Sequence, residues 1–125
     1  MNVVDSSAWL EFFADGPNAA EFAGVIIDLG ELAVPSITLF EVFKRIRTQR
    51  DAEEALRAVA QMKRGRVLDL DGDLAIMAAD ISAEMRLPLA DSVILATARS
   101  VGATLWTQDS DFEGLEGVEY RARKM

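Results

Sequence analysis

The sequence predicts an α/β protein in which a parallel sheet of about five short strands is covered by helices on both faces. Short apolar runs alternate along the chain with longer segments of helical periodicity. Strands joined through helices form parallel sheets with right-handed crossovers, and such sheets are buried on both faces. At 125 residues, half of them hydrophobic, the chain has the size of one domain, so we expect residues 1–125 to share one core.

The first half of the chain contains two predicted strands and three predicted helices. Residues 3–5 are a short apolar strand that ends on an acid, and residues 7–13 are the helix after it. An Asp-Gly-Pro turn at 15–17 precedes a second helix at about 18–29, which stops at Gly30. Residues 32–35 are the second strand. We expect Ser36 or Thr38 to cap the helix that runs to about Gln49, with Glu41 completing a capping box after Thr38.

The second half continues the alternation of strands and helices. Apolar residues recur at helical spacing from Ala52 to Met62, which predicts an amphipathic helix ending near Gly65. A third strand at 67–70 leads into a helix with apolar spacing over 74–85, and Pro88 breaks the chain after it. Residues 89–101 are apolar nearly all round, as expected for a helix buried against a sheet. A fourth strand at 103–107 and an edge strand at 118–120 complete the sheet.

The composition excludes much of enzyme chemistry. With no Cys and no His, the chain can build neither a thiolate zinc site, nor a Cys nucleophile, nor a Ser-His-Asp triad, nor an imidazole base. The 21 acidic residues remain as the main chemical resource. Catalysis is therefore expected to rest on carboxylates, either as an acid/base pair or as ligands of a hard cation such as Mg²⁺ or Mn²⁺.

The formal net charge of −8 argues against a phosphate-rich partner, because proteins that bind nucleic acid usually carry a basic surface. The objection weakens if several acids share a metal pocket, since each divalent ion returns two positive charges where the substrate sits. A cationic protein partner would also suit such a surface. No run of about 18 apolar residues is present, and an acid at position 5 does not suit a signal peptide. We therefore expect a cytoplasmic protein that does not contact membranes.

Three acids lie where the predicted topology brings loops together. Asp5 closes the first strand, Asp109 follows the fourth, and Asp91 lies in the first turn of the buried helix. Ligands of parallel α/β sheets bind beyond the carboxyl ends of the strands, so these three side chains can meet at one edge. Each also has a local interpretation as a helix cap or a turn residue. Helical phasing places Glu41 on the solvent side of its helix, within pairing range of Lys44 and Arg45.

Four stretches together resemble the PIN-domain family, in particular its VapC-like bacterial toxins. They are Val-Val-Asp-Ser-Ser-Ala-Trp-Leu (3–10), Ser-Ile-Thr-Leu-Phe-Glu-Val (36–42), Leu-Pro-Leu-Ala-Asp-Ser-Val-Ile-Leu-Ala-Thr-Ala (87–98) and Leu-Trp-Thr-Gln-Asp-Ser-Asp-Phe (105–112). The resemblance implies a three-layer α/β/α fold and ribonuclease activity on RNA. It also implies a Mg²⁺ or Mn²⁺ site whose metal-holding and catalytic residues are Asp5, Glu41, Asp91 and Asp109. A VapB-like antitoxin and a homodimer are the partners that it implies.

Several neighbouring residues have supporting roles in this interpretation. Ser6 and Thr107 could bond to a carboxylate, and Asp111 competes with Asp109 as the fourth acid. We favour Asp109 because it is nearer the strand end. The family commonly has a basic residue before its last acid, and this chain has Gln108 there. A basic rim for RNA could come from the helix after the second strand, although its basic residues could equally be an ordinary solvated face. A dimer contact could come from aromatic residues of the first helix, although core packing accounts better for most of them. These two sets are Lys44, Arg45, Arg47 and Arg50, and Trp9, Phe12 and Phe13.

Two other functions remain open from the sequence. Asp69-Leu-Asp71-Gly after an apolar strand resembles the nucleophile motif of haloacid-dehalogenase-type phosphatases, although Asp73 follows where Thr or Val is usual. We read Asp71 as the N-cap of the next helix. A non-catalytic receiver-like module with a phosphorylatable Asp is the other alternative, which the absence of a Lys directly after the fourth strand disfavours. A partial calcium-loop pattern from Asp109 fails because its twelfth position is Tyr120 and not Glu.

Overall fold

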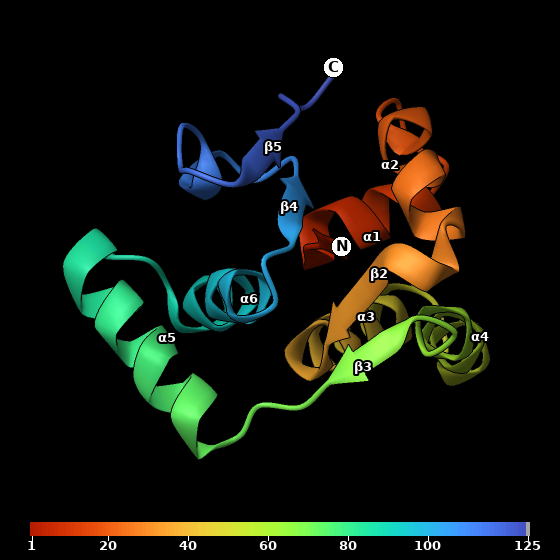
Figure 1. The fold of residues 1–125 in the computed structure, drawn as a ribbon. Coiled ribbons are helices and arrows are strands. Elements are labelled where there is room, and N and C mark those ends of the chain that lie inside the picture. The colour runs from red at the N-terminus through yellow and green to blue at the C-terminus, as the bar shows by residue number, and fades with distance from the viewer. Residues whose placement is uncertain (125) are drawn as a thin grey trace.

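The computed structural model describes residues 1–124, which form a five-stranded parallel sheet with helices on both faces (Figure 1). The strand order is β3-β2-β1-β4-β5. The strands are β1 (Asn2–Val4), β2 (Leu32–Pro35), β3 (Arg66–Leu68), β4 (Thr104–Thr107) and β5 (Val118–Tyr120). The helices are α1 (Ser6–Phe13), α2 (Ala19–Ile27), α3 (Ser36–Gln49), α4 (Ala52–Met62), α5 (Gly72–Met85) and α6 (Leu89–Ser100), with short 3₁₀ turns η1 (Leu29–Glu31) and η2 (Ser110–Phe112).

The central strand β1 pairs in parallel with β2 on one side and with β4 on the other. The chain therefore builds the sheet outward in one direction as far as β3 and then returns to the opposite side of β1 for β4 and β5. Such a reversal leaves a crevice beyond the carboxyl ends of β1 and β4. The chain leaves β1 toward β2 and leaves β4 toward β5, which lie on opposite sides. Asp5, the residue after β1, lies at this point.

The alternation of side chains along the strands divides the core in two. Val3 packs with Ala33 and Leu105 against α5 and α6 on one face of the sheet. Val4 packs on the other face with Val34 and residues of α1, α2, α3 and α4. Successive residues of a strand point to opposite faces, so each strand contributes to both cores. The predicted three-layer α/β/α architecture with five parallel strands is confirmed, and each predicted strand lies within two residues of the observed one.

The start of α3 differs from the expected capping box. The helix begins at Ser36 directly after Pro35, and no side chain caps it. The hydroxyl of Thr38 is inside the helix and donates to the Pro35 carbonyl at 2.7 Å. Glu41 instead accepts a hydrogen bond from Ser6. The prediction was wrong because Pro35 fixes the backbone at the helix entry, which brings Thr38 into the first turn.

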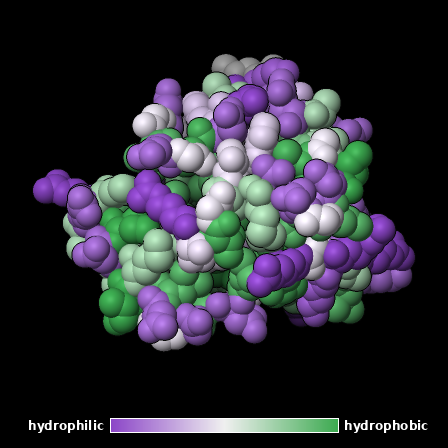
Figure 2. Space-filling model, viewed as in Figure 1, coloured by the Kyte–Doolittle hydropathy of each residue, from purple (hydrophilic) through white to green (hydrophobic). Residues whose placement is uncertain are grey.

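The aromatic residues of α1 belong to the core more than to the surface. Trp9 is 1% exposed and stacks on Phe13 with a centroid separation of 5.6 Å, while Phe12 meets Phe13 edge-on. Trp9 is therefore not available as the dimer contact that the sequence left open. On the face shown in Figure 2, apolar residues are interspersed with hydrophilic ones. No helix within residues 1–124 is long and apolar enough to cross a membrane.

Candidate active site

Asp5 is a buried acid at the centre of the sheet edge. It is 2% exposed, and its Oδ1 accepts hydrogen bonds from the Ser7 hydroxyl at 2.8 Å and from the Ala8 amide at 3.1 Å. The second bond makes Asp5 the N-cap of α1, so its local and its functional interpretations hold at once. Burial raises the pKa of Asp5 from 3.8 to about 6, although hydrogen bonds from Ser7, Ala8 and Thr107 oppose the rise.

Glu41 projects from α3 toward α1 and not into solvent. Its Oε1 accepts a hydrogen bond of 2.6 Å from the Ser6 hydroxyl, and its side chain is half-buried. Among the described residues it forms no ion pair with Lys44 or Arg45. The surface pairing expected from helical phasing was therefore wrong, because the polar side of α3 at this point faces the first turn of α1. Ser6 has the supporting role that the sequence suggested, since it orients this carboxylate.

Asp91 lies in the first turn of α6 and faces the other acids. Its pKa is raised from 3.8 to about 7, first by burial and then by the negative charges of Asp109, Asp5 and Asp111. The helix N-terminus favours a carboxylate here but does not outweigh these effects. A raised pKa from neighbouring carboxylates indicates that the acids compete for the same small region.

Asp109 and Asp111 both reach this region after β4. Carboxylate oxygens of Asp91, Asp109 and Asp111 lie within 4.8 Å of one another. Asp109 is the more enclosed of the two late acids, and its Oδ1 accepts a 2.9 Å hydrogen bond from the Asp111 amide, which starts η2. The buried Thr107 hydroxyl accepts a 2.9 Å hydrogen bond from the Asp109 amide and so fixes the backbone that carries this acid.

These acids share one cavity of about 1030 Å³, whose walls include Asp5, Glu41, Asp91 and Asp109. Asp111 belongs to the compact group of three acids but not to these walls. A carboxylate oxygen of Asp111 lies close to those of Asp91 and Asp109, but its side chain does not face the cavity. A substrate in the cavity can reach only the acids on its walls. Asp109 therefore lines the cavity, whereas Asp111 is exposed and its amide donates a hydrogen bond to Asp109.

Basic residues lie on the walls of the same cavity. Three of the four residues expected as a basic rim are there, while Arg47 instead borders an apolar groove between α3 and α4. Arg57 of α4 and Arg123 after β5 also line the acidic cavity. Neither residue was predicted from the sequence, because neither lies in a motif. The packing of α4 brings Arg57 to the cavity, and the path of the chain after β5 brings Arg123 there. The rim residues found are Lys44, Arg45 and Arg50.

The oxygen donors present suit a hard divalent cation. Mg²⁺ and Mn²⁺ prefer carboxylate oxygens and water, and the described part of the site offers them without any sulfur or imidazole ligand. Burial and, after it, repulsion from the neighbouring acids raise the pKa of Asp91, so a cation would relieve an existing electrostatic cost. The residues present therefore fit a magnesium-class ion. The four acids on the cavity wall, Asp5, Glu41, Asp91 and Asp109, would hold it.

The phosphatase-like motif lies away from this cavity. Asp69 and Asp71 are exposed on the loop before α5 and are absent from the cavity walls. The Oδ1 of Asp71 accepts a 2.8 Å hydrogen bond from the Leu74 amide, which confirms that Asp71 is the N-cap of α5. The motif therefore has a structural role in the fold.

Comparisons with known proteins agree with this geometry. The chain aligns in fold with a toxin-antitoxin complex from Klebsiella pneumoniae at 23% identity and a TM-score of 0.82, covering 99% of this chain and 100% of that one. VapC20 of Mycobacterium tuberculosis, described as a sarcin-ricin loop cleaving toxin, is 19% identical with a TM-score of 0.75, covering 90% and 92%. DNA-bound VapBC from Salmonella typhimurium is 23% identical with a TM-score of 0.73, covering 98% of each chain.

The comparison with curated proteins gives no match. The family comparison, by contrast, extends over nearly the whole chain: the model of the PIN domain matches residues 3–118, from β1 to the start of β5. This range includes all the acids that line the cavity. With the parallel sheet and the acids at its carboxyl edge, that match shows that the chain belongs to the PIN domain family.

Proposed function

We propose that this protein is a metal-dependent ribonuclease that acts as the toxin of a toxin-antitoxin pair. Its catalytic and metal-holding residues are Asp5, Glu41, Asp91 and Asp109, and its cofactor is Mg²⁺ or Mn²⁺. The observation that carries the proposal is that these four acids, from the turn after β1, from α3, from α6 and from the loop after β4, line one cavity together with several Lys and Arg side chains. Hydrolysis of a phosphodiester by a bound metal ion needs carboxylates that hold the metal. It also needs basic side chains nearby that bind the phosphates.

The basic side of the cavity answers the objection from the net charge of −8. Lys44 and Arg45 form no ion pair with any residue among 1–124 and remain free to meet an RNA backbone. Lys44 also lies over the exposed ring of Phe40, with its Nζ 5.9 Å from the ring centroid. An exposed aromatic ring beside cations is a surface on which an unpaired base can stack, so a single-stranded substrate is favoured.

The protein's own groups hold the reacting parts in place. The hydrogen bonds from Ser7 and Ala8 fix the orientation of the Asp5 carboxylate, and Ser6 fixes that of Glu41. Asp91, with its pKa near 7, can carry a proton when no cation is present and lose it when one binds. A bound Mg²⁺ or Mn²⁺ would supply Lewis-acid stabilisation of the phosphate and acidify the attacking water.

The proposed partner is an antitoxin of the VapB type, because several of the structural neighbours are toxin-antitoxin complexes. Such a protein would restrain the nuclease by placing a segment in the groove near the acids. A homodimer is also proposed from the family resemblance. Because Trp9 is buried, the contact between copies would have to use other residues.

The experiment is cleavage of single-stranded RNA by the purified protein after removal of metal with EDTA. We expect cutting on addition of Mn²⁺ or Mg²⁺ and no cutting without it. Asp5→Asn and Asp91→Asn should abolish cutting while the fold persists, since Asn also caps helices well and can replace Asp5 in that role. Asp73→Asn is the matched control, because Asp73 is an exposed first-turn acid of α5 outside the cavity.

Full activity of both Asp5→Asn and Asp91→Asn would contradict the proposal. Equal cleavage with EDTA and with Mn²⁺ would contradict its metal dependence. Expression of the wild-type chain without a partner should arrest growth of the host, and Asp91→Asn should not. If both chains arrest growth equally, the toxicity does not come from this site.

A further inference from the structure

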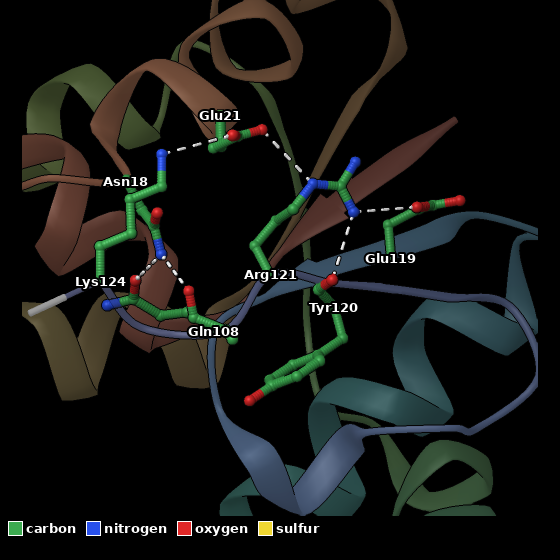
Figure 3. Close-up of polar contacts among 8 residues, drawn as sticks. Asn18, Glu21, Gln108, Glu119, Tyr120, Arg121 and Lys124 are labelled. Carbon is green, nitrogen blue, oxygen red and sulfur yellow. Dashed lines mark hydrogen bonds and ion pairs between the residues drawn. The ribbon is translucent and has the colours of Figure 1, made fainter.

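The chain after β5 continues as a segment without helix or strand, residues 121–124, which we call the C-terminal strap. Its first residue continues the sheet, because the Arg121 amide donates to the Thr107 carbonyl at 2.9 Å. The Arg121 guanidinium lies 5.2 Å from the Trp106 ring centroid and forms ion pairs with Glu21 at 3.4 Å and Glu119 at 3.1 Å (Figure 3). These contacts tie the strap to β4, β5 and α2.

A buried amide holds the middle of the strap. Asn18, before α2, is 1% exposed, and its Nδ2 donates to the Ala122 carbonyl at 2.9 Å and to Gln108 Oε1 at 3.1 Å. Figure 3 shows Asn18 reaching toward both the strap and Gln108. Gln108 directly precedes the catalytic-site acid Asp109 and is itself 3% exposed. The strap and the acidic edge are therefore fixed to the same buried side chain.

The result of this arrangement is the position of Arg123. It lines the acidic cavity together with Asp5, Glu41, Asp91 and Asp109. Its neighbours Arg121 and Lys124 both pair with Glu21, whereas Arg123 is exposed and forms no ion pair with any of residues 1–124. The Arg123 guanidinium lies on the wall of an acidic cavity but forms no ion pair with the acids there. It can therefore bind an anion that enters the cavity from outside.

We infer that Arg123 binds a phosphate of the RNA strand at the mouth of the cavity and that Asn18 is the residue that positions it. The inference rests on the proposed ribonuclease function. A polyanion approaching four carboxylates is repelled, and a cation beside them offsets this repulsion. The planar guanidinium can bind two phosphate oxygens at once, which fixes the direction of the strand as well as its distance. Lys44 and Arg45 on α3 and Arg123 on the strap would then hold the RNA from different elements.

The test begins with Arg123→Ala, Arg123→Lys and the control Arg64→Ala, each assayed for cleavage of single-stranded RNA with Mn²⁺. Arg64 is exposed after α4 and lies outside the cavity, so its loss is the same chemical change elsewhere. Arg123→Ala should raise KM about tenfold or more, as for loss of a hydrogen bond to a charged group, and leave kcat within about twofold. Arg123→Lys should recover part of the loss, and Arg64→Ala should match the wild type.

Binding without cleavage gives a second readout. Each variant is combined with Asp91→Asn so that it does not cut. Its binding to labelled RNA is then measured by fluorescence anisotropy in the presence of EDTA, over a range of salt concentrations. Loss of one phosphate contact should reduce the slope of log K against log salt by about 0.7 for a single strand. Arg123→Ala should show this decrease, and Arg64→Ala should keep the parent slope.

The positioning role of Asn18 is tested by a double-mutant cycle. Asn18→Ala should raise KM when Arg123 is present and have no further effect on KM in the Arg123→Ala chain, because the two changes remove the same contact. A structural defect alone would lower activity equally in both backgrounds. If Asn18→Ala does not fold, as circular dichroism would show, the Arg123 variants and the salt slope decide the inference.

The failures of the two proposals are distinguishable. If the wild type does not cut RNA with either metal, the proposed function fails. If the wild type cuts and Arg123→Ala has the same KM and salt slope as the wild type or as Arg64→Ala, the function stands and the role of Arg123 is refuted.

Discussion

Replacing Asp91 by Asn should stabilise the metal-free protein at alkaline pH while abolishing cleavage. The unfolded carboxyl has a pKa of 3.8 and the folded one a pKa of about 7. The native state therefore keeps a proton that the unfolded state loses, and its stability falls as the pH rises through this window. Asn cannot ionise, so the variant avoids the loss. The difference between variant and wild type should be smallest near pH 4 and largest near pH 8.

The size of the effect follows from the same pKa and from the position of Asp91. Taken in full, a rise from 3.8 to about 7 corresponds to ~4 kcal/mol. Solvent reaches part of this side chain, and screening reduces the cost to about 1–2 kcal/mol. Asn lacks the favourable interaction of a carboxylate with the N-terminus of α6, which stabilises the wild type relative to the variant by about 0.5 kcal/mol. A net gain of about 0.5–1.5 kcal/mol should raise Tm by about 2–6 °C for a chain of this length.

Thermal denaturation followed by circular dichroism, with EDTA at several pH values, measures this difference. Asp73→Asn is again the control, since it removes an exposed first-turn acid outside the cavity, and it should lower Tm slightly. Addition of Mn²⁺ should raise the Tm of the wild type more than that of Asp91→Asn. A variant that melts at or below the wild-type temperature at pH 8 would refute the argument that burial of the Asp91 charge, with repulsion from the acids around it, destabilises the metal-free fold.

Three further outcomes follow from the structure. The affinity for Mn²⁺ should rise between about pH 5.5 and 8, because protons compete for Asp5 and Asp91, with pKa values of about 6 and 7; calorimetry that shows a constant affinity would contradict this. Trp9→Ala should lower the free energy of unfolding by about 3–5 kcal/mol in urea, because Trp9 is 1% exposed in the core; a surface-like loss below about 1 kcal/mol would be inconsistent with that burial. Asp109→Asn should reduce cleavage far more than Asp111→Asn, since Asp111 is the exposed one; equal losses in the RNA assay would assign Asp111 to the site as well.

Much of the fold and part of the site were predictable from local sequence signals. The strands are brief β-branched and apolar runs, and the parallel sheet follows from their alternation with helices. Once the sheet is parallel, Asp5 and Asp109 must lie at one edge, because Asp5 directly follows β1 and Asp109 lies two residues after the end of β4. Asp91 joins them because α6, which carries it in its first turn, begins at that edge. The assignment of these residues as metal ligands remains a prediction.

The rest depends on packing that no local pattern encodes. Helical periodicity identifies the apolar face of α3 but cannot show that another element covers its polar side, as α1 does at Glu41 through Ser6. The entry of α3 depends on Pro35 and not on the Thr38 hydroxyl. The contribution of Arg123 depends on a hydrogen bond between Asn18 and Ala122, which are 104 positions apart in the sequence. Nothing near either residue signals that contact.

The central position of β1 also determines when the site can form during synthesis. Asp5 is made well before β4, which pairs with β1, and before Asp109. A nascent chain that has not passed β4 therefore carries Asp5 without the strand that flanks it or the acid that follows that strand. For a protein proposed to damage the RNA of its own cell, this order delays activity until β4 and Asp109 have been made, so the ribosome does not face a working nuclease on a chain that still lacks them.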